Sequence, residues 1–437
     1  MKNQIIAAKW ILPIRPEHLV LEDHALVISD DRIIDILPTL EAKSRYRHHE
    51  VSDFNHHVIM PGMINSHTHL AMNLFRGLGD DHTLERWLND YIWPAETKTV
   101  SKEMVYDGTQ LALAESIRAG VTCINDHYFY PDAVIKAIEE AGIRGRVSNC
   151  IFNFAVPWAD DIEQYFRDTI KTIETVDNAH TFAAIGPHSP YTVDDCIMRR
   201  VIALSDKHEL PIHIHLHETR NEVDGFREKH GLTPLQYYDK NGWLGDHFIA
   251  VHMTAADEKD IDILYKHGIS VVHCPESNMK LASGIMPSQL LFDKGINIAL
   301  GTDGAASNND LSLLGEARSA AFLAKLNYGA DKLPAAKALE MVTINGAKAL
   351  HLDHLIGSLE PGKQADFIAI NLYQPETSPV YNPMSQIIYA AASSQITDLW
   401  CRGKHIMKNR EITTLSLSNI LKKQEKWSKI IKSAFAS

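Results

Sequence analysis

The feature that most constrains the fold of this chain is a regular alternation of short apolar, β-type runs with amphipathic helical patterns between residues 59 and 352. Such alternation is typical of parallel strands joined by helical crossovers. Eight strand–helix units can be counted in this stretch, and eight is the number that closes an α/β barrel. We therefore predict an α/β protein in which residues 59–355 form a (β/α)8 TIM barrel.

The expected barrel elements can be placed approximately. The first β-type run ends at residues 58–60, before Pro61 and Gly62. Thr192 is the expected N-cap of the helix that precedes the fifth barrel strand. The predicted strands after the first cover residues 121–124, 145–152, 182–185, 211–216, 248–251, 269–272 and 296–300.

The two ends of the chain differ from the middle. Residues 1–58 and 356–415 alternate β-type runs with turns, and neither segment is long enough to form an independent sheet domain. We expect both ends to pair into one small β-sandwich. Residues 416–437 form a predicted C-terminal helix with apolar residues and lysines. Such a helix can bind a membrane surface, but packing on the protein is favoured in so acidic a chain.

Charge and cysteine content exclude several function classes. The 437 residues carry 43 Lys and Arg against 55 Asp and Glu, a formal net charge of −12. We expect neither a nucleic-acid nor a membrane partner, because phosphate surfaces need a basic footprint. The five cysteines are odd in number and never spaced C-x-x-C. This pattern argues against a disulfide framework or a thiolate zinc site and predicts a cytoplasmic protein.

Histidines gather where the predicted strands end. His67 and His69 follow the first barrel strand, and alternation along an extended chain places both side chains on one face. Active sites of such barrels lie at the carboxyl ends of the strands. Three imidazoles and a carboxylate can make an open catalytic site of the zinc type. The other candidates at strand ends, from the fourth to the eighth strand, are His188, His215, His252, His273 and Asp303.

Spacing alone does not identify the ligand on the fifth strand. His213, His215 and His217 share one face by alternation, so any of them could reach a metal. Of these, His213 fits an interior histidine or a partner of a ligand better than a ligand itself.

The chain resembles a known family over nearly its whole length. It is similar to the amidohydrolase superfamily and, within it, to the 5-methylthioadenosine/S-adenosylhomocysteine deaminases and their triazine-hydrolase and chlorohydrolase relatives. The segments that carry this resemblance are residues 61–69, 87–96, 186–191, 215–218, 252, 277–281, 301–309 and 357–366.

The resemblance implies a metal site and an acid–base pair. Zn²⁺ is the expected ion, with Fe²⁺ as the alternative. Glu218 would act as the proton shuttle, and His252 would orient the attacking water together with Asp303. The ligands of one divalent metal would be His67, His69, His215 and Asp303. Residues 183–188, at the fourth strand, contain no lysine that could bridge two ions, so we expect one metal per subunit.

The resemblance also implies a nucleoside pocket. Glu96 would hold the ribose hydroxyls, although by itself it is an ordinary carboxylate near the start of a helix. Ser307 by itself fits turn chemistry equally well. The residues at matching pocket positions are Trp87, Glu96, His188, Glu218, His273 and Ser307.

The implied activity is hydrolytic deamination of adenosine-type nucleosides to the inosine analogue and ammonia. Asn149 falls where a family arginine would bind the carboxylate of S-adenosylhomocysteine, and residues 159–163 are acidic. We therefore favour 5′-methylthioadenosine or adenosine as substrate. The resemblance also implies a homo-oligomer, a dimer or a tetramer.

Two other functions remain open at this point. The same site could serve a deaminase or dechlorinase of another aminoazine, such as guanine or an s-triazine. A bare heterocycle offers no ribose to bind, so Trp87 and Glu96 distinguish a nucleoside deaminase from an enzyme that acts on such a heterocycle. A catalytically dead scaffold on the same barrel is the third alternative. Such proteins lose metal ligands, whereas this chain keeps all four.

Overall fold

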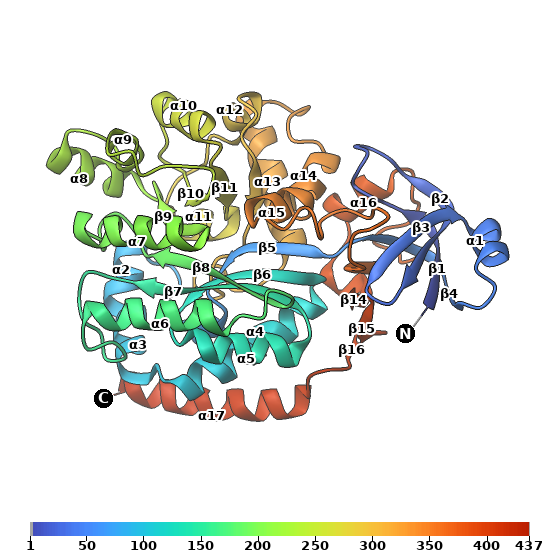
Figure 1. Cartoon of the computed structure of the whole chain (residues 1–437), viewed down its shortest axis with the longest axis horizontal. Helices are drawn as coiled ribbons and strands as arrows, with labels where there is room; N and C mark the ends of the chain where they lie inside the picture. Colours follow the sequence, from blue (N-terminus) through green and yellow to red (C-terminus); the bar gives the residue numbers. More distant parts are fainter. Residues whose placement is uncertain (1–2, 437) are drawn as a thin grey trace. The chain divides into compact units, whose positions relative to one another are not determined.

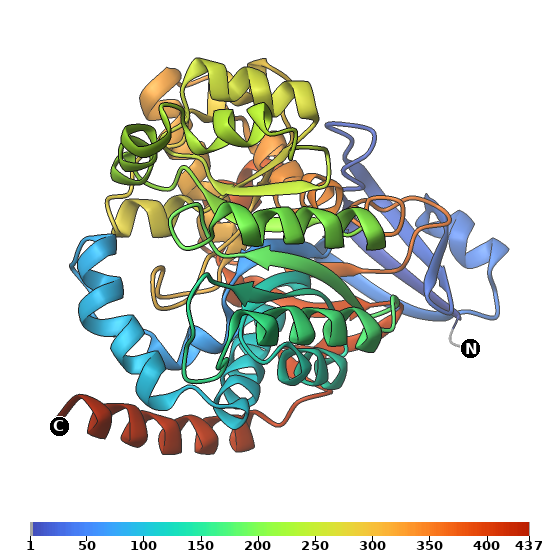
Figure 2. The ribbon, with the colours of Figure 1, turned by 60° about the vertical axis from the view of Figure 1, so that its left-hand side comes forward.

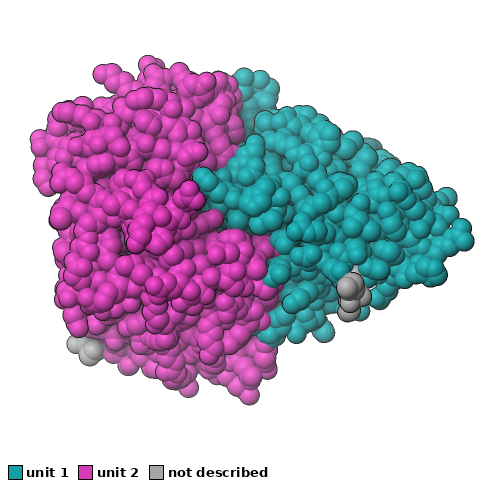
Figure 3. Space-filling model, viewed as in Figure 1, with its two compact units in different colours: residues 1–65, 114–123, 312–415 teal, residues 66–113, 124–311, 416–437 magenta. Residues whose placement is uncertain are grey.

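The computed structural model describes residues 3–436, which contain two β-sheets of eight strands each. By contacts the chain divides into two compact units, shown in Figure 3. Unit 1 comprises residues 1–65, 114–123 and 312–415, and unit 2 comprises residues 66–113, 124–311 and 416–437. The domain boundaries expected from the sequence stay predictions.

One sheet is the barrel. Its strands follow one another in chain order, and the paired registers from β7 to β12 are parallel (Figure 1). Beyond β12, the Asp303 N–H donates to the carbonyl of His67 on β5 at 3.1 Å. The predicted TIM barrel is thereby confirmed. Its strands are β5 (Met63–Thr68), β6 (Val121–Tyr128), β7 (Arg144–Ile151), β8 (Thr181–Pro187), β9 (Ile212–Leu216), β10 (Phe248–His252), β11 (Ser270–His273) and β12 (Ile298–Leu300).

Helices separate these strands along the chain, as the sequence pattern predicts. Every residue of β7 and β8 is buried, because a parallel sheet covered on both faces has no side open to solvent. The helices between β5 and β12 are α2 (Leu84–Arg86), α3 (Trp93–Thr99), α4 (Lys102–Arg118), α5 (Pro131–Ala141), α6 (Ile162–Thr175), α7 (Asp195–His208), α8 (Arg220–His230), α9 (Pro234–Lys240), α10 (Glu258–His267), α11 (Pro275–Lys280) and α12 (Ser288–Asp293). The short helical segments η1 (Leu70–Phe75) and η2 (Trp87–Ile92) lie between β5 and α3.

The second sheet joins the two ends of the chain. β4 pairs in parallel with β1 and antiparallel with β13, so an N-terminal and a C-terminal segment lie side by side. This confirms the predicted β-sandwich built from both ends. Its strands in spatial order are β16 (Glu411–Ile412), β15 (Lys404–Lys408), β14 (Ile396–Cys401), β13 (Phe367–Asn371), β4 (Glu50–Pro61), β1 (Asn3–Ile11), β2 (Leu21–Ser29) and β3 (Arg32–Pro38).

Alternation along β1 supplies both faces of this sheet with core residues. Ile6 belongs to a large buried cluster that includes Phe367 and Trp400 from the C-terminal end. Its neighbour Ile5 points to the opposite face and packs with Val27. The helices of this part of the chain are α1 (Thr39–Arg45), α13 (Leu313–Tyr328), α14 (Ala335–Met341), α15 (Ile344–Ala349) and α16 (Pro383–Tyr389), with the short η3 (Ser393–Gln395).

Helix α7 begins two residues later than the sequence predicts. Thr192 is not the N-cap of α7; the cap is Asp194, whose carboxylate accepts the N–H of Ile197, because a carboxylate satisfies a helix N-terminus well.

Gly62 separates β4 from β5. A Cβ at this position would lie 2.2 Å from the side chain of Thr122, so only glycine fits.

The C-terminal helix α17 (Leu417–Ala436) packs on its own unit, as favoured from the sequence; residue 437 lies outside the described residues. It lies against α3, which Figure 2 shows as the blue segment beside the red helix. Trp427 is buried, and its Nε1 donates to Asp107 Oδ2 at 2.8 Å, while Lys423 lies 2.8 Å from the other oxygen. None of the helices in the described part of the chain is both long and apolar enough to cross a membrane.

We predict that Trp427→Ala destabilises this unit by about 3–5 kcal/mol, the usual cost of removing a large buried aromatic side chain. Trp427→Phe keeps most of the packing and loses the hydrogen bond, so its cost is about 1 kcal/mol. Urea unfolding followed by far-ultraviolet circular dichroism measures both. Lys429→Ala, at an exposed position of the same helix, is the control. A Trp427→Ala variant no less stable than this control would show that α17 does not depend on the contact.

Candidate active site

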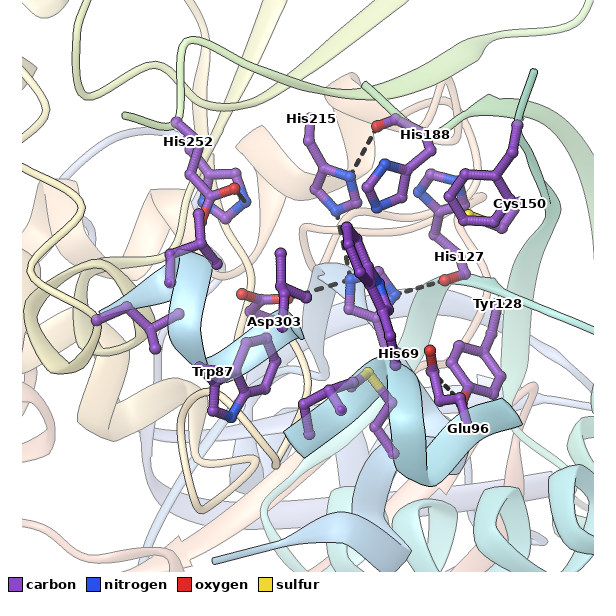
Figure 4. Close-up of a pocket in the computed structure, with 18 of the residues that line it drawn as sticks. His69, Trp87, Glu96, His127, Tyr128, Cys150, His188, His215, His252 and Asp303 are labelled. Carbon is purple, nitrogen blue, oxygen red and sulfur yellow. Dashed lines mark hydrogen bonds and ion pairs between the residues drawn. The ribbon is translucent and has the colours of Figure 1, made fainter. Parts of the chain in front are cut away.

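The four side chains predicted to bind a metal converge at the carboxyl ends of the barrel strands, and Figure 4 shows three of them, His69, His215 and Asp303, pointing toward one another. Asp303 Oδ1 lies 3.3 Å from His67 Nε2 and 3.2 Å from His69 Nε2. The Nε2 atoms of His69 and His215 are 3.3 Å apart. Side chains from three strand ends therefore meet within contact distance.

These separations fit a single ion. Ligand atoms at about 2.0–2.2 Å from a tetrahedral metal lie about 3.3 Å from one another. His67 Nε2 is buried and has no hydrogen-bond partner among the described residues. This is expected of a nitrogen atom that binds a metal ion. Two overlapping groups of donor atoms lie within 4.8 Å of one another: His67, His69 and Asp303, and His67, His215 and His252. The described side chains can therefore hold a metal ion.

Contacts behind the ligands aim each imidazole at the centre. The Nδ1 of His67 lies 2.9 Å from His213 Nε2, and the Nδ1 of His215 lies 2.8 Å from the carbonyl of His188. His69 Nδ1 contacts the carbonyl of His127 in the same way. With Nδ1 engaged, each ring presents Nε2 to the site. Burial lowers the pKa of His67 and of His215, which keeps these rings neutral, as metal binding requires.

Asp303 is held as an anion by its neighbours. Burial opposes its ionisation, but the imidazoles of His67 and His69 outweigh it and hold the pKa of Asp303 well below its usual range. Its Oδ2 accepts the hydroxyls of Ser277 at 2.7 Å and Ser307 at 3.0 Å. Both hydroxyls fix the carboxylate so that Oδ1 faces the histidines.

Glu218 and His252 lie beside this centre. Glu218 Oε2 is 3.9 Å from His252 Nε2. Burial, followed by the nearby charge of Asp303, raises the pKa of Glu218 well above its usual range, so it can carry a proton at neutral pH. Burial lowers the pKa of His252 to about 3. The backbone N–H of Glu218 donates to Glu222 Oε2 at 2.8 Å, which holds the turn after β9 in place.

The pocket above the centre has an apolar wall with a few polar groups. Trp87 begins the π-helical segment η2, and its buried Nε1 has no hydrogen-bond partner among the described residues. Glu96 on α3 accepts the hydroxyl of Tyr128 at 2.6 Å, and burial raises its pKa to about 7. His188, labelled in Figure 4, and Tyr191 line the same pocket. Trp87, Glu96 and His188 thus lie together, as the sequence analysis expects.

Two other predicted pocket residues lie elsewhere. Ser307 is behind Asp303, where its hydroxyl donates to that carboxylate and to the carbonyl of Gly304. His273 is buried at the end of β11, and neither residue belongs to the described pocket lining. Their direct contact with substrate stays a prediction.

Several pocket residues were not found from the sequence. Tyr128 ends β6, Cys150 lies on β7, and Phe152 follows that strand; all three line the pocket. The rule that barrel sites lie at strand ends could have found them. Asn149 is not in the described lining; its side chain donates to the carbonyl of Tyr165 at 3.2 Å.

Comparison with known proteins identifies close relatives. Residues 58–406 match the amidohydrolase family. A 5-methylthioadenosine/S-adenosylhomocysteine deaminase from Saccharophagus degradans is 44% identical over 99% of this chain and 98% of its own. A 5′-deoxyadenosine deaminase from Methanothermobacter thermautotrophicus is 38% identical over 92% of this chain and 93% of its own. The crystal structure of an adenosine deaminase from Xanthomonas campestris with bound zinc is 40% identical, covers 99% of both chains and has a TM-score of 0.96.

The family match spans most of the chain, including both the barrel strands and the returning strands of the sandwich. The relatives extend it to nearly the full length. This confirms the resemblance seen in the sequence motifs: the chain belongs to the amidohydrolase family.

Proposed function

We propose that this chain is a metal-dependent hydrolytic deaminase of adenosine-type nucleosides. Its substrate class is 5′-methylthioadenosine and related nucleosides, which it converts to the inosine analogue and ammonia. One observation carries the proposal: Glu96 and Trp87 line the same pocket as His69, His215 and Asp303. A hydrolase of a bare heterocycle has no ribose to engage a carboxyl group there. The names of the relatives at 44% and 38% identity agree with this assignment.

The metal would be held by one buried donor set. His67, His69, His215 and Asp303 would bind one divalent ion per subunit. Zinc in the crystal structure of the 40% identical relative favours Zn²⁺, with Fe²⁺ as the alternative. When bound, such an ion lowers the pKa of a coordinated water from about 15.7 to about 7 and so supplies a nucleophile at neutral pH.

The acid–base groups divide the remaining work. As water adds to C6 of the adenine ring, Asp303, which its depressed pKa keeps ionised beforehand, accepts a proton from it. Glu218, whose raised pKa favours its protonated form, donates a proton to the ring nitrogen. Glu218 then takes the proton of the hydroxyl now on C6 and passes it to the amino group, the C6–N bond breaks, and ammonia departs. The proton held by Asp303 restores Glu218. General acid–base help of this kind contributes about 10²–10⁴-fold in rate.

A second cavity gives room for the substituent on the 5′ carbon. It has a volume of about 660 Å³ and shares Leu84, Leu88, Trp93 and Tyr191 with the wall of the active-site pocket. Beyond these side chains the cavity wall also carries polar and charged groups, among them Arg220 and Glu222. The cavity has room for a methylthio group on the 5′ carbon.

We further propose that the enzyme works in the cytoplasm. The five cysteines are free thiols, and four of them are buried. Free thiols are typical of proteins in reducing compartments. Assembly as a dimer or tetramer stays a prediction.

We predict that Glu218→Gln lowers kcat by about 10²–10⁴-fold because the amide cannot donate and regain the proton. Metal content should stay at the wild-type level, since Glu218 is not one of the proposed ligands. Steady-state deamination kinetics and elemental analysis of the same samples test both points. Glu228→Gln, at an exposed position of α8, is the matched control. Loss of metal, or retention of most of the rate, would contradict the proposed role.

We predict that the zinc-loaded protein deaminates 5′-methylthioadenosine, 5′-deoxyadenosine and adenosine but not free adenine or guanine, because Glu96 binds the ribose. Loss of the adenine absorbance, with guanine followed by ammonia release, measures each rate. Glu96→Gln should lower kcat/KM by about tenfold or more, the loss expected for a hydrogen bond to a charged group. Glu103→Gln, on the exposed face of α4, is the control.

Activity confined to free bases would overturn the nucleoside assignment. Equal effects of Glu96→Gln and Glu103→Gln would overturn the role of Glu96. Measuring S-adenosylhomocysteine in the same assay compares the deamination rate for a charged 5′ substituent with the rate for an uncharged one.

A further inference from the structure

Helix α11 places two adjacent buried side chains behind the reacting groups. The hydroxyl of Ser277 donates to Asp303 Oδ2 at 2.7 Å, and the Nδ2 of Asn278 lies 3.0 Å from His252 Nδ1. Both side chains are buried, and Asn278 is outside the lining of the pocket. Asn278 therefore contacts His252, which lines the pocket, without lining the pocket itself.

The contacts of His252 with its neighbours show how its ring is oriented. It stacks on His215 with the ring centroids 5.5 Å apart and meets the edge of His67 at 5.7 Å. Its Nε2 faces Glu218, 3.9 Å from Oε2. Its Nδ1 therefore faces α11, and its Nε2 faces the pocket.

We propose that Asn278 is a positioning residue that fixes the tautomer of His252, with the single ring proton on Nε2. An amide nitrogen has only protons to offer, so the Nδ1 that it contacts must accept. The proton of the neutral ring is then on Nε2, where it points toward the active site. His252 is thus a hydrogen-bond donor there.

This assignment has a consequence for the metal site. A ring nitrogen that carries a proton has no lone pair for a metal, so His252 is excluded from the ligands. Of the two overlapping donor groups, the one that contains Asp303 then remains complete. The statement about catalysis rests on the proposed function: the Nε2–H would donate to the oxygen that adds to C6, where negative charge develops in the transition state.

The test is a pair of substitutions at one position. Asn278→Asp keeps the size and an acceptor oxygen but removes the N–H, so it draws the proton to Nδ1 and reverses the tautomer. We expect kcat to fall by about 10²–10³-fold with KM changed by less than about threefold, as for the loss of an oriented donor. Asn278→Leu removes the partner without imposing the wrong tautomer, so its loss of kcat is smaller. Metal content stays at the wild-type level in both variants.

Asn241→Asp is the matched control. Asn241 is exposed, and its Nδ2 also donates to an acceptor, the carbonyl of Tyr237, at 2.8 Å. This control is expected to keep the wild-type rate.

Three results would overturn the proposal. One is an Asn278→Asp variant as active as the wild type, which would mean that Asn278 presents its oxygen to a protonated Nδ1. The second is a larger loss of kcat in Asn278→Leu than in Asn278→Asp. The third is a loss of metal in proportion to the loss of rate, which would make His252 a ligand.

Nitrogen-15 spectra of the zinc-loaded wild-type protein provide a readout that does not need activity. The His252 resonances can be assigned with a His252→Asn variant. An unprotonated Nδ1 supports the proposal, and a protonated Nδ1 overturns it. This measurement decides the matter if Asn278→Asp does not fold. It also separates this inference from the proposed function, because it applies even if no nucleoside is deaminated.

Discussion

The rest of the site depends on the close approach of Asp303 Oδ1 to the histidine nitrogens, at 3.2–3.3 Å, inside a buried site. A buried carboxylate oxygen and imidazole nitrogens this close to one another need a cation between them, either a proton or a metal ion. The approach requires that the strand carrying His67 and the loop after β12 meet at one edge. The barrel meets this requirement through the bond from the Asp303 N–H to the His67 carbonyl.

Three residues at or near the same edge have a strained backbone conformation. His217, His252 and Asp303 all have positive φ values, of 52°, 79° and 58°. Non-glycine residues adopt this conformation only where the surrounding structure holds them, and such sites cluster where function needs a fixed geometry. At His252 and Asp303 the chain turns at the strand end, and both side chains reach the centre, whereas the Nε2 of His217 accepts the N–H of Leu235. Contacts behind the site, such as the N–H of Glu218 to Glu222, oppose the relaxation of these turns.

Much of this could be predicted from the sequence, because it follows from periodicity and from the position of strand ends. The alternation of elements predicts the barrel, and strand-end histidines predict the metal centre. Side-chain contacts between distant segments could not be predicted. Spacing leaves His213 and His215 equivalent, and only the structure shows that His213 contacts His67 from behind. Ser307 was expected in the pocket, but its hydroxyl is directed at Asp303 by a local turn. The cap at Asp194 in place of Thr192 likewise depends on a shift of two residues in the helix start.

The central claim is that these four side chains hold one ion per chain. The most direct test is elemental analysis of zinc-reconstituted protein after removal of loosely bound metal, for the wild type, His69→Ala and Asp303→Asn. The account predicts one tightly bound equivalent per chain in the wild type and much less than one in both variants. Two tight equivalents in the wild type, or one equivalent retained in both variants, would contradict it.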